Sequence, residues 1–166
     1  MFERLESFSE KLNQVCKFLV TVAMSVLLVI MTVAVILRYG FSFTLSWSDA
    51  LARYMLVWST FLGAAVAVKT DQHINLTIIQ DAFPEKIRNV IKLIAYFAFL
   101  FLGIFFFNAG IEVVNLVLPQ KSSAMPISMG WPYGAIMVSY GIIIVQLFIK
   151  IILFIRENFS NKRISS

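Results

Sequence analysis

The feature that most constrains this chain is an uncharged, apolar run over residues 18–37. An α-helix rises about 1.5 Å per residue, so about 20 such residues cross the ~30 Å hydrocarbon core of a bilayer. The run is too long for the hydrophobic region of a typical signal peptide. The residues that follow it, Arg38-Tyr39-Gly40-Phe41, do not form the small-x-small pattern of a cleavage site. We therefore expect a membrane-spanning helix here.

Three further stretches, over residues 46–68, 93–118 and 127–149, are also long and apolar enough to cross a bilayer. Of the 166 residues, 60% are hydrophobic and 14% are charged, and the mean hydropathy is +0.85. This composition is too apolar for an ordinary soluble domain. The sequence predicts an all-α integral membrane protein, with one membrane domain over residues 1–166 and four transmembrane helices.

The distribution of basic residues predicts the orientation of these helices. With four spans, both termini lie on one side of the membrane, together with the connection between the second and third spans. Cytoplasmic segments of membrane proteins carry an excess of Lys and Arg. Three basic residues fall on the side opposite the termini, Arg38, Arg53 and Lys121, and eleven fall on the terminal side: Arg4, Lys11, Lys17, Lys69, Lys86, Arg88, Lys92, Lys150, Arg156, Lys162 and Arg163. We expect cytoplasmic termini.

The net charge of +5 does not indicate a nucleic-acid partner. The basic residues sit in clusters between apolar spans, as membrane topology requires, so the partners that they predict are membrane lipids. The polar residues 1–17 either lie on the membrane surface or begin the first helix early, with an apolar face at helical spacing: Leu5, Phe8, Leu12 and Val15. Ser46, followed by Asp49 three residues on, predicts the start of the second helix.

The second span carries an acid and a base one helical turn apart, Asp49 and Arg53. Ionisable groups inside a membrane helix usually face protein or water, so we expect a polar neighbour for this segment. Farther along, Gly63 and Ala64 belong to a small-residue surface where another helix can approach closely. Trp47 fits the aromatic belt at the membrane interface.

The third span carries a polar face, because Asn108, Glu112 and Asn115 are spaced i, i+4, i+7. Glu112 and Arg53 have similar expected depths, which allows an ion pair between helices two and three. A local pair of Asp49 with Arg53 competes with it. These charges either hold the bundle together, meet interfacial water, contact a partner protein, or take part in moving a solute or ion.

Residues for enzymatic chemistry are sparse. The only histidine, His73, lies at a cytoplasmic membrane edge, where a surface or helix-capping role is the simplest interpretation. A bis-histidine haem and a Ser-His-Asp site are excluded, and the single cysteine, Cys16, excludes a cysteine metal cluster. No phosphate-binding glycine loop is present. We expect no cofactor, no metal and no enzymatic activity.

In length, spans and order the chain resembles the small membrane subunit of tripartite ATP-independent periplasmic (TRAP) transporters. The resemblance covers nearly the whole chain and is carried by Asp49, Arg53, Trp58, Gly63-Ala64 and His73. A second match is Ser122-Ser123-Ala124-Met125-Pro126, which leads into the last span with Trp131 and Tyr133. The family commonly has Glu at the position of Asp49 and Asp at the position of Thr77.

The resemblance implies a component of a sodium-driven organic-acid transporter of the bacterial inner membrane. In that family a large multispan subunit holds the sodium and substrate sites, a periplasmic protein delivers the solute, and the small subunit braces the large one. The alternatives are a stand-alone, homo-oligomeric carrier or channel, for which no broken helix or paired repeat is visible, and a membrane enzyme. The residues that we expect at helix-packing or subunit contacts are Asp49, Arg53, Trp58, Gly63, Ala64, His73, Asn108 and Glu112.

Overall fold

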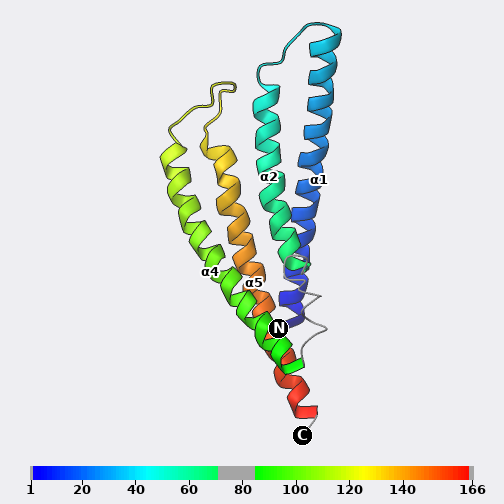
Figure 1. The fold of residues 1–166 in the computed structure, drawn as a ribbon, viewed down its shortest axis with the longest axis vertical. Helices are drawn as coiled ribbons and strands as arrows, with labels where there is room; N and C mark the ends of the chain where they lie inside the picture. Colours follow the sequence, from blue (N-terminus) through cyan, green and yellow to red (C-terminus); the bar gives the residue numbers. More distant parts are fainter. Residues whose placement is uncertain (1, 71–84, 165–166) are drawn as a thin grey trace.

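The computed structural model of the chain describes residues 2–70 and 85–164. These ranges contain four α-helices: α1 over Phe2–Gly40, α2 over Ser48–Lys69, α4 over Glu85–Val117 and α5 over Gly130–Ile164 (Figure 1). Each helix includes a stretch that is long and apolar enough to cross a membrane. The expected all-α membrane fold with four spans is therefore confirmed.

The helices form two antiparallel hairpins (Figure 1). The connections over residues 41–47 and 118–129 lie at one end of the molecule, which we call the hairpin end. Both chain termini lie at the other end, which we call the terminal end. Helix α2 packs against α1 and α5, and α5 also packs against α4. Helix α5 is thus the element that joins the two hairpins.

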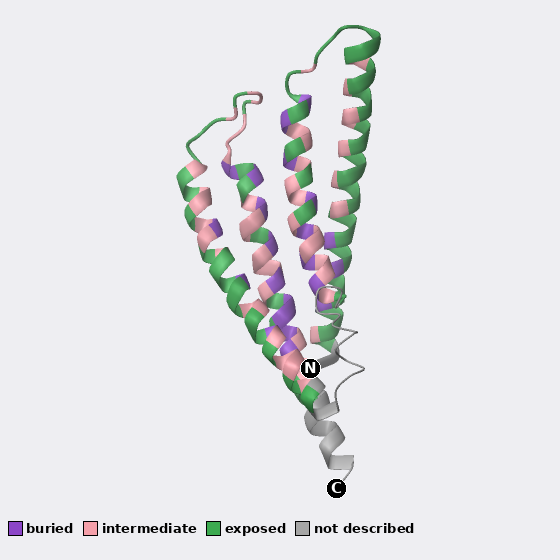
Figure 2. Cartoon of the chain, viewed as in Figure 1, coloured by how far each residue is buried: buried purple, intermediate pink, exposed green. Residues whose placement is uncertain are grey.

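Much of the apolar surface of the four helices is exposed (Figure 2). The most apolar stretch of α1 contains no buried residue, and α4 buries only a small share of its own. Large apolar side chains such as Leu28, Val29, Phe101 and Phe105 are more than 60% exposed. In water such a surface would drive aggregation. In this chain it is the surface that lipid or another membrane protein covers.

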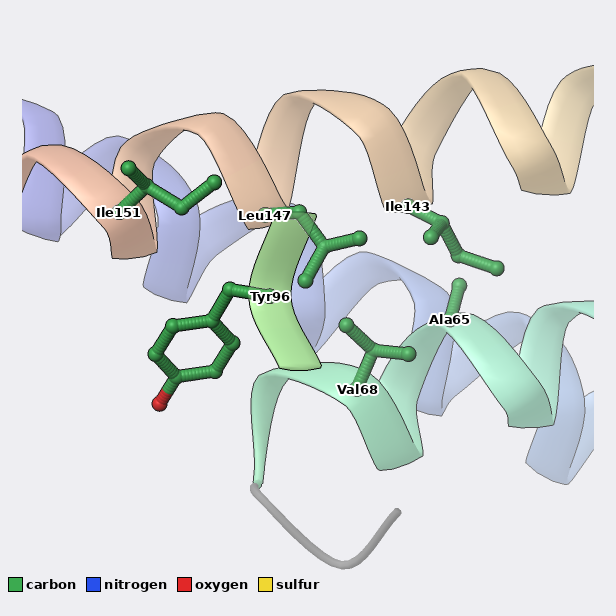
Figure 3. Packing of buried hydrophobic residues seen from close by; sticks show 6 residues of the cluster. All are labelled: Ala65, Val68, Tyr96, Ile143, Leu147 and Ile151. Carbon is green, nitrogen blue, oxygen red and sulfur yellow. The ribbon is translucent and has the colours of Figure 1, made fainter. Parts of the chain in front are cut away.

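The apolar core lies toward the terminal end, where α2, α4 and α5 meet (Figure 3). Leu147 of α5 and Ala65 of α2 are fully buried there, with Tyr96 of α4 beside them. The remaining buried members of this cluster are Val68, Ile143 and Ile151. Close packing of these three helices fixes the positions of the polar groups described below.

Glycines on α4 and α5 let these two helices approach closely. A methyl group added at Gly110 would lie 3.3 Å from the backbone nitrogen of Met137, and one added at Gly103 would lie 3.3 Å from Ile144. Gly103 and Gly110 are seven residues apart, so they share one face of α4. Small residues at such contacts are typical of packed membrane helices.

Helix α1 is continuous from Phe2, so the first helix begins early, as one of the two expected arrangements has it. The apolar spacing of Leu5, Phe8, Leu12 and Val15 does not identify the face that α1 buries. Phe8 and Val15 are both 54% exposed, and the buried residues of this segment are Ser9, Asn13 and Cys16. A protein in a membrane turns apolar residues to lipid at little cost, so hydrophobic spacing does not identify the buried face there.

Two helix starts also differ from the prediction. Helix α2 begins at Ser48, and no side chain caps it, so the expected cap by Ser46 with Asp49 is wrong. Helix α5 begins at Gly130, three residues after the expected start of the last span. Ser128 accounts for this, because its Oγ accepts a hydrogen bond from the Gly130 N–H at 3.1 Å and donates to the Leu118 carbonyl at 2.6 Å.

Candidate functional site

The expected ion pair of Asp49 with Arg53 is not formed. Both side chains are exposed, and within the described part of the chain neither has an ionic partner within 4.0 Å. Asp49 lies in the first turn of α2, where a negative charge is favourable near the unsatisfied backbone N–H groups. Sequence spacing allowed the pair, but in solvent-exposed positions the attraction is weak and does not hold two flexible side chains together.

The contacts of Tyr54 show at which level of the bundle the neighbouring Arg53 lies. The Tyr54 side chain is only 8% exposed, and its hydroxyl donates a 2.8 Å hydrogen bond to Ser122 Oγ in the connection between α4 and α5. The same hydroxyl lies 3.6 Å from the sulfur of Met129. Arg53 is the preceding residue and therefore lies at the level of this connection, beyond the end of α4.

The expected pair of Arg53 with Glu112 is not formed either. Glu112 lies five residues before the end of α4 at Val117, so it is about 8 Å deeper than the connection beside which Arg53 lies. Helices α2 and α4 also share no extensive contact, since each packs on α5. The depth estimate from sequence was wrong because α2 extends past the end of α4 at the hairpin end (Figure 1).

Trp58 lies one turn below Tyr54 on α2 and contacts α5. Its ring centroid lies 5.5 Å from that of Trp131, with a tilt of 50° between the rings. The indole Nε1 is buried and has no hydrogen-bond partner among the described residues. Together with the Tyr54 contacts, this pair of rings joins α2 to the start of α5 at the hairpin end, so the predicted role of Trp58 in helix packing has a contact within the chain.

The small residues of α2 divide between two faces. Ala65 is fully buried in the core, and Ala64 is half-buried. Gly63 is half-buried, but a methyl group added there would meet nothing within 4 Å. Within this chain, the close helix approach therefore takes place at Ala65, and the space beside Gly63 stays open.

Lys150 makes a contact between helices that sequence reasoning missed. Its Nζ donates hydrogen bonds to the carbonyl oxygens of Val68 at 2.9 Å and Lys69 at 3.1 Å, at the end of α2. It also lies 5.8 Å from the centre of the Tyr96 ring of α4. A cation at a helix C-terminus satisfies carbonyls that have no partner in the helix. The available signal was a lysine directly after the uncharged run 127–149.

The polar face of the third span is present on α4, and all of it is exposed. Asn108, Glu112 and Asn115 point away from the rest of the chain. Asn108 Nδ2 donates a 3.0 Å hydrogen bond to the Ile104 carbonyl of its own helix. His73 lies outside the described residues. The described residues include no group of three His, Cys, Asp or Glu side chains that could hold a metal ion.

Comparison with known proteins gives a family match over most of the chain. Residues 27–157 match the model of the DctQ component of tripartite ATP-independent periplasmic transporters. A putative TRAP transporter small permease protein of Haemophilus influenzae is 27% identical over 90 residues, which are 54% of this chain and 56% of that protein. The sialic acid TRAP transporter small permease protein SiaQ of Vibrio cholerae is 29% identical over 84 residues, or 51% of this chain and 49% of that protein.

A third relative is much larger. The isethionate TRAP transporter permease protein DctMQ of Oleidesulfovibrio alaskensis is 29% identical over 103 residues, which are 61% of this chain but only 16% of that protein. The matches thus span about half the length of the two small relatives and a small part of the large one.

Proposed function

This chain belongs to the DctQ component family of tripartite ATP-independent periplasmic transporters, and we propose that it braces the large transport subunit of a sodium-driven organic-acid transporter in the bacterial inner membrane. The family match confirms the resemblance to the small TRAP subunit. Its relatives are permease subunits, which are transport components, so the expectation that the chain is not an enzyme is also confirmed. The chain is a multi-pass bacterial membrane protein.

The observation that carries the bracing role is the exposed apolar surface of α1 and α4. The four helices are joined through α5, and the most apolar stretch of α1 contains no buried residue, so much of its apolar surface is uncovered (Figure 2). In the DctMQ relative, the region similar to this chain is part of one much longer permease chain. A small subunit that forms a wall against a large one accounts for both facts.

The solute is an organic acid in this proposal. The names of two relatives specify sialic acid and C4-dicarboxylates, and a third specifies isethionate. All three solutes are organic anions. The polar side chains of this chain that lie within its spans do not converge on a common site, since Arg53, Glu112 and Lys150 belong to three separate places. The solute and sodium sites therefore belong to the large subunit.

We place the terminal end in the cytoplasm and the hairpin end in the periplasm, because the basic residues are in excess on the side of the termini. The connection over residues 118–129 then faces the periplasm, where it is available to a solute-binding protein. Reporter fusions test this orientation. A reporter after Ser166 should be cytoplasmic and one at Lys121 periplasmic, and a periplasmic signal from the Ser166 fusion would contradict it.

The functional role is tested by deletion and by binding measurements. Deleting this chain should abolish organic-acid uptake and lower the amount of the large subunit in the membrane. Calorimetry on the purified chain with sialic acid, succinate and isethionate should show no binding. Solute affinity in the purified chain would overturn the bracing role and favour the stand-alone carrier.

A further inference from the structure

The polar face of α4 lies opposite the face that packs on α5. Gly103 and Gly110 mark the packed face, because their backbones approach Ile144 and Met137 of α5. Successive residues turn about 100° around a helix. Asn108, Glu112 and Asn115 therefore lie roughly 140–200° around α4 from Gly110. We call these three residues the α4 polar stripe. Its direction is away from every other described helix.

The α4 polar stripe lies within a segment that crosses the membrane. The candidate span of α4 covers Asn89–Val117, and Glu112 is five residues, or about 8 Å, inside its end. Around it on the same side of the helix stand exposed apolar rings such as Phe101 and Phe105. A carboxylate in this position faces hydrocarbon if nothing covers it, which is costly for an ionised group.

The described part of the chain offers no cation to Glu112. Among the described residues, none forms an ion pair with Glu112. Two basic residues toward the hairpin end, Arg53 and Lys121, lie beyond the end of α4, and Arg53 belongs to α2, which packs against α5. Asn115 likewise makes no hydrogen bond through its side chain within the described part of the chain. The partner of the stripe must come from outside.

We propose that the α4 polar stripe docks a membrane helix of the large permease subunit, which places an arginine or lysine at the depth of Glu112. The inference rests on the proposed function, since it takes the large subunit as the partner. Two observations favour the large permease subunit as the partner of the α4 polar stripe. The charge of Glu112 requires a cation or donor within the membrane, which lipid chains do not supply. The DctMQ relative combines a region similar to this chain with a large permease in one protein.

Glu112 acts here as a positioning contact between subunits. A buried ion pair contributes to specificity because a buried charge without its counter-charge is unfavourable. Removing Glu112 would leave a cation of the large subunit buried and unpaired. Asn108 and Asn115 flank Glu112 by one turn on each side and supply amide hydrogen bonds. Together they fix the register of α4 against the docked helix.

Co-purification tests the proposal. The chain and the large permease subunit of the same transporter are co-expressed with an affinity tag on the chain. The variants are Glu112→Gln, Glu112→Leu and, as the matched control, Asp49→Asn, which neutralises an exposed carboxylate at the hairpin end. Glu112→Gln and Glu112→Leu should lower the yield of large subunit per chain at least about tenfold, as expected for a broken buried pair. Asp49→Asn should retain the yield.

The outcomes separate the two proposals. If the large subunit co-purifies with the wild-type chain and equally well with both Glu112 variants, the docking inference is wrong and the bracing role stands. If the wild-type chain brings down no large subunit, the bracing role itself fails. Circular dichroism of the purified Glu112 variants should match wild type, because the side chain is exposed, and this measurement distinguishes lost docking from lost folding.

Discussion

The terminal end and the hairpin end of this bundle treat charged groups in opposite ways. At the terminal end, Lys150 of α5 is half-buried, donates to the last carbonyls of α2 and lies near the Tyr96 ring of α4. Toward the hairpin end, Asp49, Arg53 and Glu112 are exposed and have no ionic partner among the described residues. The difference indicates that Lys150 is held by contacts within the chain, whereas Glu112, which lies inside its span, requires a contact from outside the chain.

Two glycines, Gly110 and Gly63, also differ in whether they contact another helix of the same chain. Gly110 is in close contact with the backbone of α5, and Gly63 faces open space. Both residues lie in apolar helices, so their sequence contexts are alike. A glycine that contacts a helix of the same chain contributes to folding, and one that faces open space is free to contribute to assembly.

The largest expected effect is at Gly110. A valine there would press its Cβ against the Met137 backbone, which cannot move aside as a flexible side chain can. We expect Gly110→Val to destabilise the isolated chain by roughly 1–3 kcal/mol, as overpacking does. Thermal unfolding in detergent measures this effect. Gly63→Val is the control and should unfold like wild type. Equal stability of the two variants would contradict the α4–α5 contact.

Lys150→Ala should have the next largest effect. The substitution removes two hydrogen bonds from a charged donor to the end of α2, which we expect to cost about 2 kcal/mol. Lys17→Ala removes an exposed lysine of α1 and should cost little. The same unfolding measurement compares the two variants. A loss that is no greater for Lys150→Ala than for Lys17→Ala would show that the terminal end does not depend on this cation.

Tyr54→Phe should have a smaller effect of about 1 kcal/mol, because it removes one hydrogen bond, to Ser122, and keeps the ring. The change tests the link between α2 and the connection over residues 118–129. Hydrogen exchange of the amides in that connection should become faster in Tyr54→Phe. Tyr133→Phe is a suitable control, since Tyr133 is 40% exposed. Unchanged exchange in Tyr54→Phe would argue against the link.

The smallest expected effect concerns Asp49 and Arg53 in the isolated chain. A double-mutant cycle with Asp49→Asn and Arg53→Gln should give a coupling free energy of about 0–0.5 kcal/mol, as for exposed pairs. A coupling well above about 1 kcal/mol would restore the ion pair that the sequence suggested.

The sequence sufficed to predict the four apolar spans that the described residues contain, because the length of an apolar run is set by the thickness of the membrane. It did not suffice for which faces are buried. On α1, Ser9, Asn13 and Cys16 are buried, whereas the large apolar side chains of Phe8 and Val15 are exposed. Lipid accepts apolar side chains as readily as a protein core does, so hydrophobicity carries little information about helix contacts.

The pairing of Arg53 with Glu112 failed for a related reason. Residue counts placed both at similar depths, but they contain no information that α5 stands between α2 and α4, or that α2 extends past the end of α4. Lys150 was missed because its partners are backbone carbonyls, which have no signature in the sequence. Contacts between elements distant in the chain account for both errors.

The central claim is that the large permease subunit covers the α4 polar stripe near the hairpin end of the bundle. Labelling of a single cysteine at position 115 tests it most directly. In a Cys16→Ser, Asn115→Cys chain, a maleimide should react readily when the chain is alone in detergent and much more slowly when the large subunit is co-expressed and co-purified. A cysteine placed at Lys121 controls for general access. Equal labelling rates at position 115 with and without the large subunit would contradict the account.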